Sequence, residues 1–433
     1  MPIWNPEYEC MERAQMRELQ LSRLKDQITR AYTHSKHYHA ALDAAGVHPG
    51  DIHELSDLAK LPFTDKTALR DNYPFGMFTV PMNEIVRVHS SSGTTGKPIV
   101  VGYTRADLQI WTEMCARLCS AAGVTADDRV DMTFLYGMFT GGWGMHYAIE
   151  RIGATIIPAG SGATERHLMM MQDFGTTVFI GTPSYAVYLS EVGEREGIDF
   201  AQLPIRLGLF GGEATSVAMR KEIEARMGIR ATDNYGLSEV GGPGVAGECE
   251  VGVGRHVNED NFYPEIIDPD TGEVLPEGEV GELVLTTLTK EAMPILRYRT
   301  HDLTRLTYEP CACGRTLCRI DPVRTRTDDM LIIRGVNVYP SQVEDILFSV
   351  EGVSPHYLIV VDRKSGLDNL EIRLEIDAAL FSDRMEPLVE MQERIAEKVQ
   401  AVLGLRAHIR LVEPGSIERT QGKSKRVLDR RKL

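Results

Sequence analysis

The sequence has 433 residues, 43% hydrophobic and 25% charged, which is the composition of a soluble globular protein too long for a single core. The net charge of −15 disfavours nucleic acid and anionic membranes as partners. It would also repel ATP, so any nucleotide site must supply positive charge locally.

The chain ends and the cysteines indicate the compartment. No apolar run approaches the ~20 residues of a membrane helix, and the first ten residues do not have the pattern of a signal peptide. We therefore expect a cytoplasmic protein, in which seven cysteines do not suggest a disulfide framework. The segment 419–433 has seven basic residues and one acid, which by itself predicts only a solvated tail or nonspecific anion binding.

The predicted elements begin with one amphipathic helix over about the first thirty residues, with apolar positions at Leu21, Leu24, Ile28 and Ala31. From residue 130 to 281 short apolar runs alternate with helix-like stretches. The runs predict buried strands at 130–135, 154–159, 177–181, 205–212 and 282–287, and the helices are clearest at 164–174 and 216–228. This alternation favours an α/β architecture with a largely parallel sheet.

The pattern changes after about Arg326. Before it, residues 268–285 form a hairpin-rich β stretch with Gly and Pro at the turns. After it, strands at 357–361 and 370–376, a helix from about Met385 to Leu403 and a strand at 407–412 predict a compact α+β unit. We expect a large domain, 1–327, of mixed sheets layered with helices plus a β-rich subdomain, and a small, mobile α+β domain, 328–433.

The strongest local motif is the segment 90–98, SSSGTTGKP, which lies between two apolar runs. Its hydroxyls, glycines and lysine suit a loop that wraps phosphate oxygens, although Ser/Thr/Gly clusters are often only loops. It is not a Walker A loop, because Ser91 and Pro98 stand where that pattern needs Gly and Ser or Thr.

This segment resembles the phosphate loop of the adenylate-forming superfamily of acyl-CoA synthetases, adenylation domains and luciferases. Four further motifs resemble that superfamily in the same order: YGLSE at 235–239, YRTHD at 298–302, a hinge and loop at 328–337, and TQGKSKR at 420–426. Within the superfamily the chain most resembles the phenylacetate–CoA ligase family, through YGMFTGGWGMHY, DNYGLSEVGGPGV, DNFYPEIIDP and IIRGVNVYPSQVE.

The resemblance implies an ATP-dependent acid–thiol ligase that forms an aryl-CoA thioester, with phenylacetyl-CoA as the first expectation. The reaction would pass through an acyl-adenylate and release AMP and pyrophosphate, using ATP, Mg²⁺, coenzyme A and a small aromatic carboxylic acid. Two alternatives stay open, namely acyl transfer to a carrier or partner protein and an inactive metabolite-binding relative. The sequence also leaves the oligomeric state open, a homodimer included.

The resemblance also implies catalytic roles. Adenylation builds negative charge on a pentavalent α-phosphate, so cations and donors are needed around that phosphorus. Lys423 matches the family's catalytic lysine, with Lys425 as the alternative. Ser238 would bond the α-phosphate, and Glu239 would hold Mg²⁺, a hard cation that binds oxygen ligands.

Other residues are expected to bind ATP or AMP by the same resemblance. Tyr235 would stack on adenine opposite Gly211 and the two residues after it, with Asp233 or Asn234 near the adenine amine. Asp302 would accept both ribose hydroxyls, and Arg326 would lie near the ribose or the phosphates. The full set is Ser91, Ser92, Gly93, Thr94, Thr95, Gly96, Lys97, Gly212, Glu213, Asp233, Asn234, Tyr235, Gly236, Asp302 and Arg326.

An acyl pocket, a CoA tunnel and a hinge complete the expected site. Aromatic walls with glycine gaps suit a flat ring, although a core strand and turn would have the same composition. The pocket residues are Tyr136, Phe139, Gly141, Gly142 and Trp143; the tunnel residues are Gly335, Val336 and Asn337; the hinge is Asp328. Two departures from the family pattern are His301 for Gly and Ile332 for a frequent Lys.

A second group of residues has the composition of a metal site. Cys249, His256, Cys311 and Cys313 offer three sulfurs and one imidazole, a closed set for structural Zn²⁺. Cys318 could replace one of them, and free buried cysteines are the alternative interpretation. Core packing explains Cys115 and Cys119, which are four apart on a predicted helix.

Overall fold

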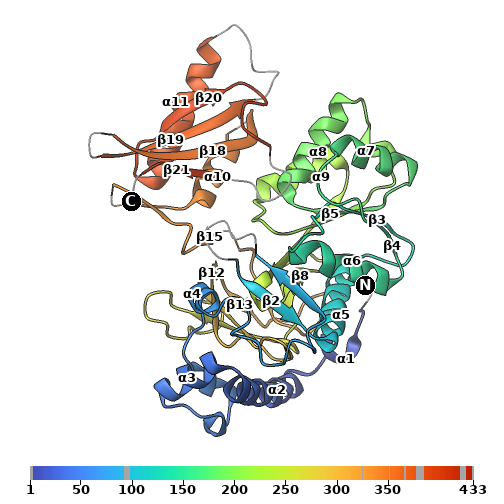
Figure 1. The fold of residues 1–433 in the computed structure, drawn as a ribbon. Coiled ribbons are helices and arrows are strands. Elements are labelled where there is room, and N and C mark those ends of the chain that lie inside the picture. Colours follow the sequence, from blue (N-terminus) through green and yellow to red (C-terminus); the bar gives the residue numbers. More distant parts are fainter. Residues whose placement is uncertain are drawn as a thin grey trace.

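The structure is a computed structural model that describes residues 3–91, 98–323, 325–334, 336–350, 352–364, 367–376, 385–419 and 426–431. Figure 1 shows a large body and a smaller unit, coloured orange to red, that follows β15 (Thr325–Arg326). Among the helices that these residues form, none combines the length and apolarity needed to cross a membrane.

The large body is built on a nine-stranded sheet with the order β13-β14-β9-β8-β7-β6-β5-β3-β4. Its parallel half consists of β4 (Thr155–Ile157), β3 (Arg129–Met132), β5 (Val178–Gly181), β6 (Leu207–Phe210) and β7 (Arg230–Leu237). Strands β5 and β6 are buried throughout, as expected for parallel strands covered on both faces. The predicted α/β architecture is confirmed.

Two sets of helices cover the two faces of this sheet (Figure 1). Val178 and Ile180 of β5 belong to the core that contains α5 (Arg105–Ala122) and α6 (Thr140–Ile152). Phe179 between them belongs to a second core with α7 (Thr164–Asp173), α8 (Pro183–Arg195) and α9 (Val217–Met227). Alternate side chains of one strand thus bury opposite faces.

The other half of the large sheet is antiparallel. It contains β8 (Gly242–Glu248), β9 (Arg255–Val257), β14 (Arg319–Ile320) and β13 (Leu306–Thr307). A separate four-stranded sheet has the order β10 (Phe262–Ile267), β11 (Gly281–Thr287), β12 (Tyr298–Thr304) and β15. A hairpin of β1 (Arg87–Ser90) and β2 (Val100–Tyr103) stands apart from both.

Two helices, not one, occupy the N-terminal segment. The short α1 (Pro6–Glu9) is followed by α2 (Arg13–His34), so the single predicted helix was wrong at its start. The apolar face of α2 packs into the main core as predicted, with Leu24, Ile28 and Ala31 buried and Leu21 partly buried. The remaining helices of the large body are α3 (Lys36–Ala45), η1 (Pro49–Asp51), η2 (Leu55–Lys60), α4 (Lys66–Asp71), η3 (Phe200–Gln202) and η4 (Ser238–Val240).

The small unit has its own sheet and its own core. Its elements are β16 (Leu331–Ile333), β17 (Val336–Val338), α10 (Pro340–Phe348), β18 (Val353–Lys364), β19 (Leu367–Ile376), α11 (Met385–Leu403), β20 (His408–Val412) and β21 (Val427–Asp429). The sheet order is β20-β19-β18-β21, and the buried apolar residues of this core run from Ile333 to Ile409.

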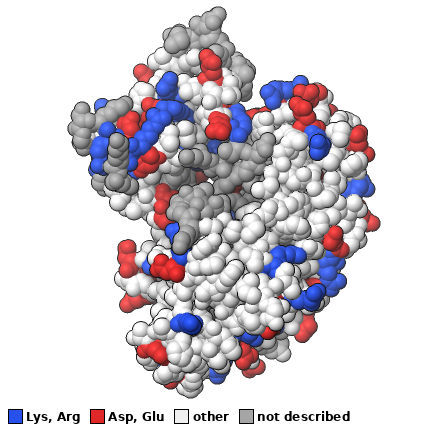
Figure 2. All heavy atoms as spheres, viewed as in Figure 1, with Lys and Arg blue, Asp and Glu red and all other residues white. Residues whose placement is uncertain are grey.

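Polar contacts join the small unit to the large body. His356 Nε2 lies 2.8 Å from Glu191 Oε1, and Arg419 lies 3.8 Å from the other oxygen of the same carboxylate. Thr325 Oγ1 and Ser341 Oγ are 2.9 Å apart. A cavity of about 430 Å³ remains between the two parts, and Figure 2 shows the surface hollowed where they meet. Any ligand in this cavity would touch residues of both parts.

Candidate nucleotide and acyl site

The β1–β2 hairpin brings together the two ends of the predicted phosphate loop. Ser90 pairs with Val100, the Ser91 amide donates to the Ile99 carbonyl at 2.9 Å, and the Ile99 amide donates back to Ser91 Oγ at 3.0 Å. The loop residues themselves, Ser92, Gly93, Thr94, Thr95, Gly96 and Lys97, lie outside the described residues. The Ser90 amide also donates to the Met138 carbonyl at 3.0 Å, which fixes the hairpin beside the predicted acyl pocket.

A second wall of the site lies where β6 and β7 end. A Cβ on Gly211 would lie 2.9 Å from the Asn234 carbonyl oxygen, so the two chains approach closely only because this residue is glycine. Gly212 follows with φ of 83°, in the left-handed region. Glu213 Oε1 accepts from the Ser184 amide at 2.7 Å, at the start of α8. This is the carboxyl edge of the parallel strands, where open α/β sheets bind ligands.

Tyr235, Asp302, Arg326 and Asp328 form one continuous chain of polar contacts. The Tyr235 hydroxyl donates to Asp302 Oδ2 at 2.5 Å, and Arg326 Nη1 donates to Asp302 Oδ1 at 2.6 Å. Asp302 and Arg326 face each other across β12 and β15, and Arg326 also binds both Asp328 oxygens, at 2.8 and 3.0 Å. The structure therefore brings four predicted site residues together.

Two carboxylates, Asp302 and Asp328, share the single Arg326 guanidinium in this chain. Burial raises the pKa of Asp302, and the Arg326 guanidinium opposes that shift. Burial and the Asp302 carboxylate raise the pKa of Tyr235, which keeps its hydroxyl protonated and donating. Burial also opposes the ionisation of Asp328, but its hydrogen bonds from Arg326 lower its pKa overall. The result is a buried carboxylate with one donor and one cation already in place.

Ser238 and Glu239 lie in η4, directly after β7. Ser238 Oγ is 3.1 Å from Thr140 Oγ1 at the start of α6. Glu239 is 8% exposed, and its carboxylate adds to burial in raising the pKa of Tyr298. Gly236 is required just before them, because a Cβ there would lie 2.2 Å from the Gly242 carbonyl oxygen. The Ser238 hydroxyl and the Glu239 carboxylate thus lie at the start of η4, three and four residues after Tyr235.

Asp233 and Asn234 were predicted near the adenine amine; the Asp233 carboxylate is paired elsewhere, whereas the amide nitrogen and oxygen of the buried Asn234 side chain make no hydrogen bond among the described residues. The buried Asp233 carboxylate pairs with Arg255 of β9. The Asn234 carboxamide faces β8, where a Cβ on Gly247 would lie 2.8 Å from its oxygen. Sequence reasoning missed the Asp233–Arg255 pair, because nothing local links two residues that are 22 positions apart.

The predicted acyl-pocket segment forms a compact aromatic group at the start of α6. The Trp143 indole donates to the Tyr136 carbonyl at 2.7 Å, and the Tyr136 hydroxyl lies 3.0 Å from His146 Nδ1. The Tyr136 and Trp143 rings meet edge to face at 5.3 Å. Burial raises the pKa of Tyr136.

The two glycines of this segment are needed for space. A Cβ on Gly142 would lie 2.8 Å from the Leu135 carbonyl oxygen, and one on Gly141 would lie 2.4 Å from the Phe139 ring. Phe139 itself is 37% exposed and Met138 is 53% exposed. The segment therefore presents apolar surface next to the phosphate-loop hairpin.

The structure describes only some of the predicted site residues of the small unit. Val336 and Asn337 lie in β17, opposite Ile333 and Ile332 of β16, whereas Gly335 and the predicted catalytic Lys423 lie outside the described residues. His301, the departure from glycine, adopts φ of 64°. This left-handed backbone explains why a glycine is the more usual residue there, and histidine is among the side chains that tolerate it.

The interdomain cavity adds residues that the motifs did not single out. Its small-unit wall contains Tyr339, Glu344, Tyr357 and Arg426, and Arg326 and Glu213 line it from the large body. The Tyr357 hydroxyl donates to Glu344 at 2.5 Å, and the Arg426 guanidinium stacks 4.5 Å from the Tyr357 ring centroid. Arg426 is the last residue of the motif TQGKSKR, so that motif could have predicted Arg426 in this wall.

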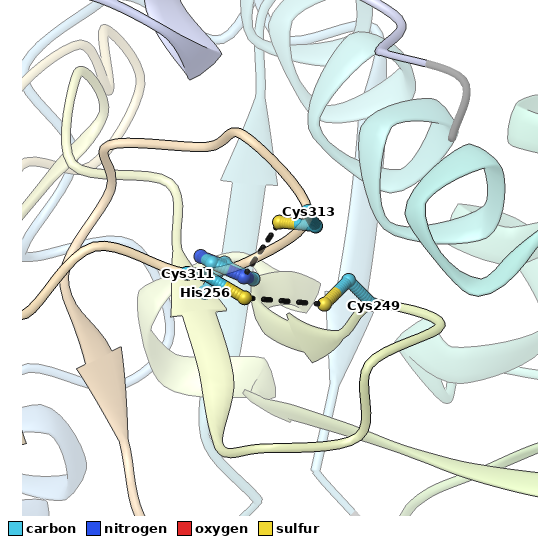
Figure 3. A group of neighbouring side chains, drawn as sticks. All are labelled: Cys249, His256, Cys311 and Cys313. Carbon is cyan, nitrogen blue, oxygen red and sulfur yellow. Dashed lines mark hydrogen bonds between the residues drawn. The ribbon is translucent and has the colours of Figure 1, made fainter.

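The four cysteine and histidine residues predicted as a metal site also lie together, at the far end of β8 and β9 (Figure 3). Their ligand atoms are within 4.8 Å of one another, and all four residues are buried. Cys318, the predicted substitute, lies instead in the main core with its amide donating to Glu259.

Comparison with known proteins adds two family matches and full-length relatives. The family profile described as "AMP-binding enzyme" matches residues 22–288, and "AMP-binding enzyme C-terminal domain" matches 335–431. The chain is 47% identical to the phenylacetate-coenzyme A ligase of Thermus thermophilus, over 99% of this chain and 100% of that protein. It is 49% identical to that of Aromatoleum evansii, over 100% and 99%.

The solved structures of 2-hydroxyisobutyryl-CoA ligase are similar to this chain over 99% of its length and 92% of theirs. In the postadenylation state, with R3-HIB-AMP, the TM-score is 0.93 at 31% identity. In the thioesterification state, with 2-HIB-AMP and CoA, it falls to 0.74 at 32% identity. Because both are one enzyme, the difference reflects how its parts are arranged, and the present arrangement matches the former. By sequence and by fold, this chain belongs to the adenylate-forming AMP-binding enzymes and, among them, to the family of the phenylacetate–coenzyme A ligases.

Proposed function

We propose that the chain converts phenylacetate, or a closely related aryl acid, into its CoA thioester. In the first step the carboxylate attacks the α-phosphate of ATP and pyrophosphate leaves. In the second step the CoA thiol attacks the acyl carbon of the adenylate, loses its proton, and AMP leaves with the carboxylate oxygen. The observation that carries the proposal is the buried Tyr235–Asp302–Arg326 chain at the carboxyl edge of the parallel strands.

That chain suits the ribose of ATP. Asp302 has accepted one hydrogen bond from Tyr235 and one from Arg326, and a carboxylate has about four acceptor positions. Two positions therefore remain for the ribose hydroxyls. Arg326 also lines the interdomain cavity, but Asp302 and Asp328 already pair with it, so the positive charge that the ATP phosphates need would come from Lys97 and Lys423.

We assign the stabilisation of the negative charge on the α-phosphate in the transition state to three further groups. Lys423 would bridge the α-phosphate and the carboxylate, as a compact cation can. Ser238 would donate to the α-phosphate, and Glu239 would hold Mg²⁺, which prefers oxygen ligands. Tyr235 would pack on the adenine with Gly212 and Glu213 on its other side. Asp233, held by Arg255, would then support this wall and not bind the base directly.

The aryl ring would lie against the aromatic segment at the start of α6. Tyr136 and Trp143 are fixed by their own hydrogen bonds, so they offer a rigid wall. Gly141 and Gly142 keep the backbone close to that wall, and Phe139 is exposed enough to close on a ligand. These features favour a flat ring over a branched aliphatic chain.

The two half-reactions require two arrangements of the small domain, which we take as 328–433 against 1–327. Lys423 serves the first step, whereas Gly335, Val336 and Asn337 would line the path of the CoA thiol in the second. Both sets cannot occupy one site together, so the domain must rotate about a few residues near Asp328. The TM-scores of 0.93 and 0.74 support the first arrangement as the present one.

Pyrophosphate release over a panel of aryl and aliphatic acids, with and without CoA, tests the proposal. Without CoA, we expect about one pyrophosphate per chain to be released and the reaction then to stop. With CoA, we expect continued turnover that forms AMP and phenylacetyl-CoA in equal amounts. Turnover only with a carrier protein would reassign the acyl acceptor, and no pyrophosphate release with any acid would leave a metabolite-binding protein instead.

We expect the reaction in the cytoplasm, with no nucleic-acid or membrane partner. Gel filtration decides between a monomer and a homodimer.

A further inference from the structure

The six buried cysteines of this chain fall into two structural classes. Cys115, Cys119 and Cys318 are buried in the main core, as ordinary apolar thiols are. Three others, Cys249, Cys311 and Cys313, form a separate small cluster, in which Ala121 is the one other fully buried member among the described residues and Val251 packs at the edge. Apolar packing alone therefore does not explain why this second set gathers.

The distances in the second set match a tetrahedral metal site. Zinc–sulfur bonds of about 2.3 Å and zinc–nitrogen bonds of about 2.0 Å, at tetrahedral angles, place two sulfurs about 3.8 Å apart and a sulfur and nitrogen about 3.5 Å apart. Cys249 Sγ and Cys311 Sγ are 3.8 Å apart, and Cys313 Sγ lies 3.4 Å from His256 Nε2 (Figure 3). A disulfide would need about 2.05 Å.

The backbone around the sulfurs forms the same turn twice. In 249–252 and again in 311–314 a cysteine carbonyl accepts from the amide of the glycine three residues later, at 3.0 Å. Both glycines, Gly252 and Gly314, have positive φ, 71° and 89°. Such turns direct backbone amides at sulfur: Val251 donates to the Cys249 thiol and Arg315 to the Cys313 thiol. Donated hydrogen bonds of this kind stabilise thiolates.

The histidine is oriented for a ligand on its other nitrogen. His256 Nδ1 lies 3.4 Å from the Leu317 carbonyl, which leaves Nε2 facing the sulfurs. Metal-binding histidines commonly use one nitrogen for the metal and fix the other with a backbone carbonyl. The backbone that carries the ring is fixed, because β9 pairs with β14 at this residue, His256 opposite Arg319.

We propose that Cys249, His256, Cys311 and Cys313 bind one structural Zn²⁺ ion. Three soft sulfurs and one imidazole select zinc over Mg²⁺ and Ca²⁺, which prefer oxygen. Four protein ligands leave no open position, so the site is structural and takes no part in the ligase reaction. Three thiolates around Zn²⁺ carry one net negative charge, and the Arg315 side chain, which contacts Cys313, lies beside it.

The ion would join three separate segments of the chain beside the antiparallel strands β8, β9 and β14. The ligands come from the turn after β8, from β9 and from the loop between β13 and β14, and that loop holds the N-terminal segment through the buried Arg315–Glu9 pair. Next to His256, Arg255 pairs with Asp233 in the nucleotide wall. The metal would thus hold β9, the strand whose Arg255 supports this wall.

Metal content of the purified full-length chain tests the site. Mass-spectrometric metal analysis should find about one zinc per chain in the wild type. It should find the same in Cys115→Ser, a matched control buried in the main core, and a loss of most zinc in Cys313→Ser. Co²⁺ exchanged for the native metal should give the intense thiolate-to-metal absorption of a tetrahedral site.

If Cys313→Ser does not fold, the wild type alone decides. A mercurial reagent should release one zinc as it titrates the thiols, and the released ion is read with a chromogenic chelator. A zinc-free wild type with freely reactive thiols would overturn the proposal. So would a chain two hydrogen atoms lighter because Cys249 and Cys311 are disulfide-bonded, or zinc content that Cys313→Ser leaves unchanged.

Discussion

Replacing Asp302 with asparagine tests the nucleotide site at its centre. The change keeps the size of the side chain but removes its charge. In the structure this carboxylate is 3% exposed and accepts from Tyr235 at 2.5 Å and from Arg326 at 2.6 Å. In the proposed complex it also accepts both ribose hydroxyls of ATP, so asparagine should weaken two ligand bonds at once.

The magnitude follows from the bonds that change. A hydrogen bond to a charged group contributes about 1.5–3 kcal/mol and a neutral one about 1 kcal/mol, so two weakened ribose bonds cost about 1–4 kcal/mol. That lowers kcat/KM for ATP about 5- to 900-fold. Stability should suffer less, by about 1–2 kcal/mol, because Arg326 keeps both hydrogen bonds to Asp328.

Asp260→Asn is the matched control. Asp260 is equally buried and binds Arg117 through two hydrogen bonds, at 2.6 and 3.1 Å, away from the nucleotide site. Arg117 is buried too, so this change should cost about 3 kcal/mol of unfolding free energy and leave the ATP kinetics unchanged. Pyrophosphate-coupled kinetics and urea unfolding measure the two effects. If Asp302→Asn keeps kcat/KM for ATP within a factor of about three of the wild type, a change below the cost of two weakened bonds, Asp302 does not hold the ribose.

Three further changes test other parts of the account. Lys423→Ala should slow adenylation about 100- to 1000-fold, because a lost transition-state cation costs about 2.7–4 kcal/mol, while transfer from preformed acyl-adenylate to CoA changes little in a single-turnover assay. Asp328→Pro should preserve single-turnover pyrophosphate release and abolish CoA-ester formation, because proline fixes φ at the hinge. His167→Gln should remove a pH-dependent part of the unfolding free energy: burial lowers the pKa of His167, but its buried partner Asp131, at 2.8 Å, raises it overall. That stability is complete below about pH 6.5 and lost as pH rises through the folded pKa, as urea unfolding at several pH values would measure.

Each of these has a clear contrary result. Equal losses in both half-reactions of Lys423→Ala, or a loss as large in Lys425→Ala, would move the catalytic role elsewhere. A normal rate of CoA-ester formation by Asp328→Pro would mean that the chain turns at another residue. Unfolding curves of the wild type and His167→Gln that differ by the same amount at every pH would show that His167 is not charged in the folded state.

The fold could be predicted because its signals are local. Apolar runs such as 177–181 form strands buried on both faces, and α11 begins and ends at the predicted residues. The break between α1 and α2 could not be predicted in this way. It depends on contacts far along the chain, where the Thr316 amide donates to the Glu9 carbonyl and Arg315 pairs with the Glu9 carboxylate.

The residues of the site could be predicted from the sequence, but the contacts between them could not. Motifs identified Tyr235, Asp302 and Arg326 singly, whereas the register of β12 against β15 decides that two of them meet. The use of Asp233 by Arg255 depends in the same way on β9 lying beside β8. Sequence spacing alone predicted neighbouring side chains only where the residues are close in sequence, as for Cys311 and Cys313.

The fate of the carboxylate oxygen tests the central claim most directly. With phenylacetate labelled with ¹⁸O in its carboxylate, one labelled oxygen should appear in AMP for every molecule of phenylacetyl-CoA formed, because the adenylate carries that oxygen to phosphorus. Mass spectrometry of the nucleotide products reads this result. Label in inorganic phosphate together with ADP would mean an acyl phosphate in place of an acyl-adenylate, and unlabelled AMP would mean that the carboxylate never attacked the α-phosphate.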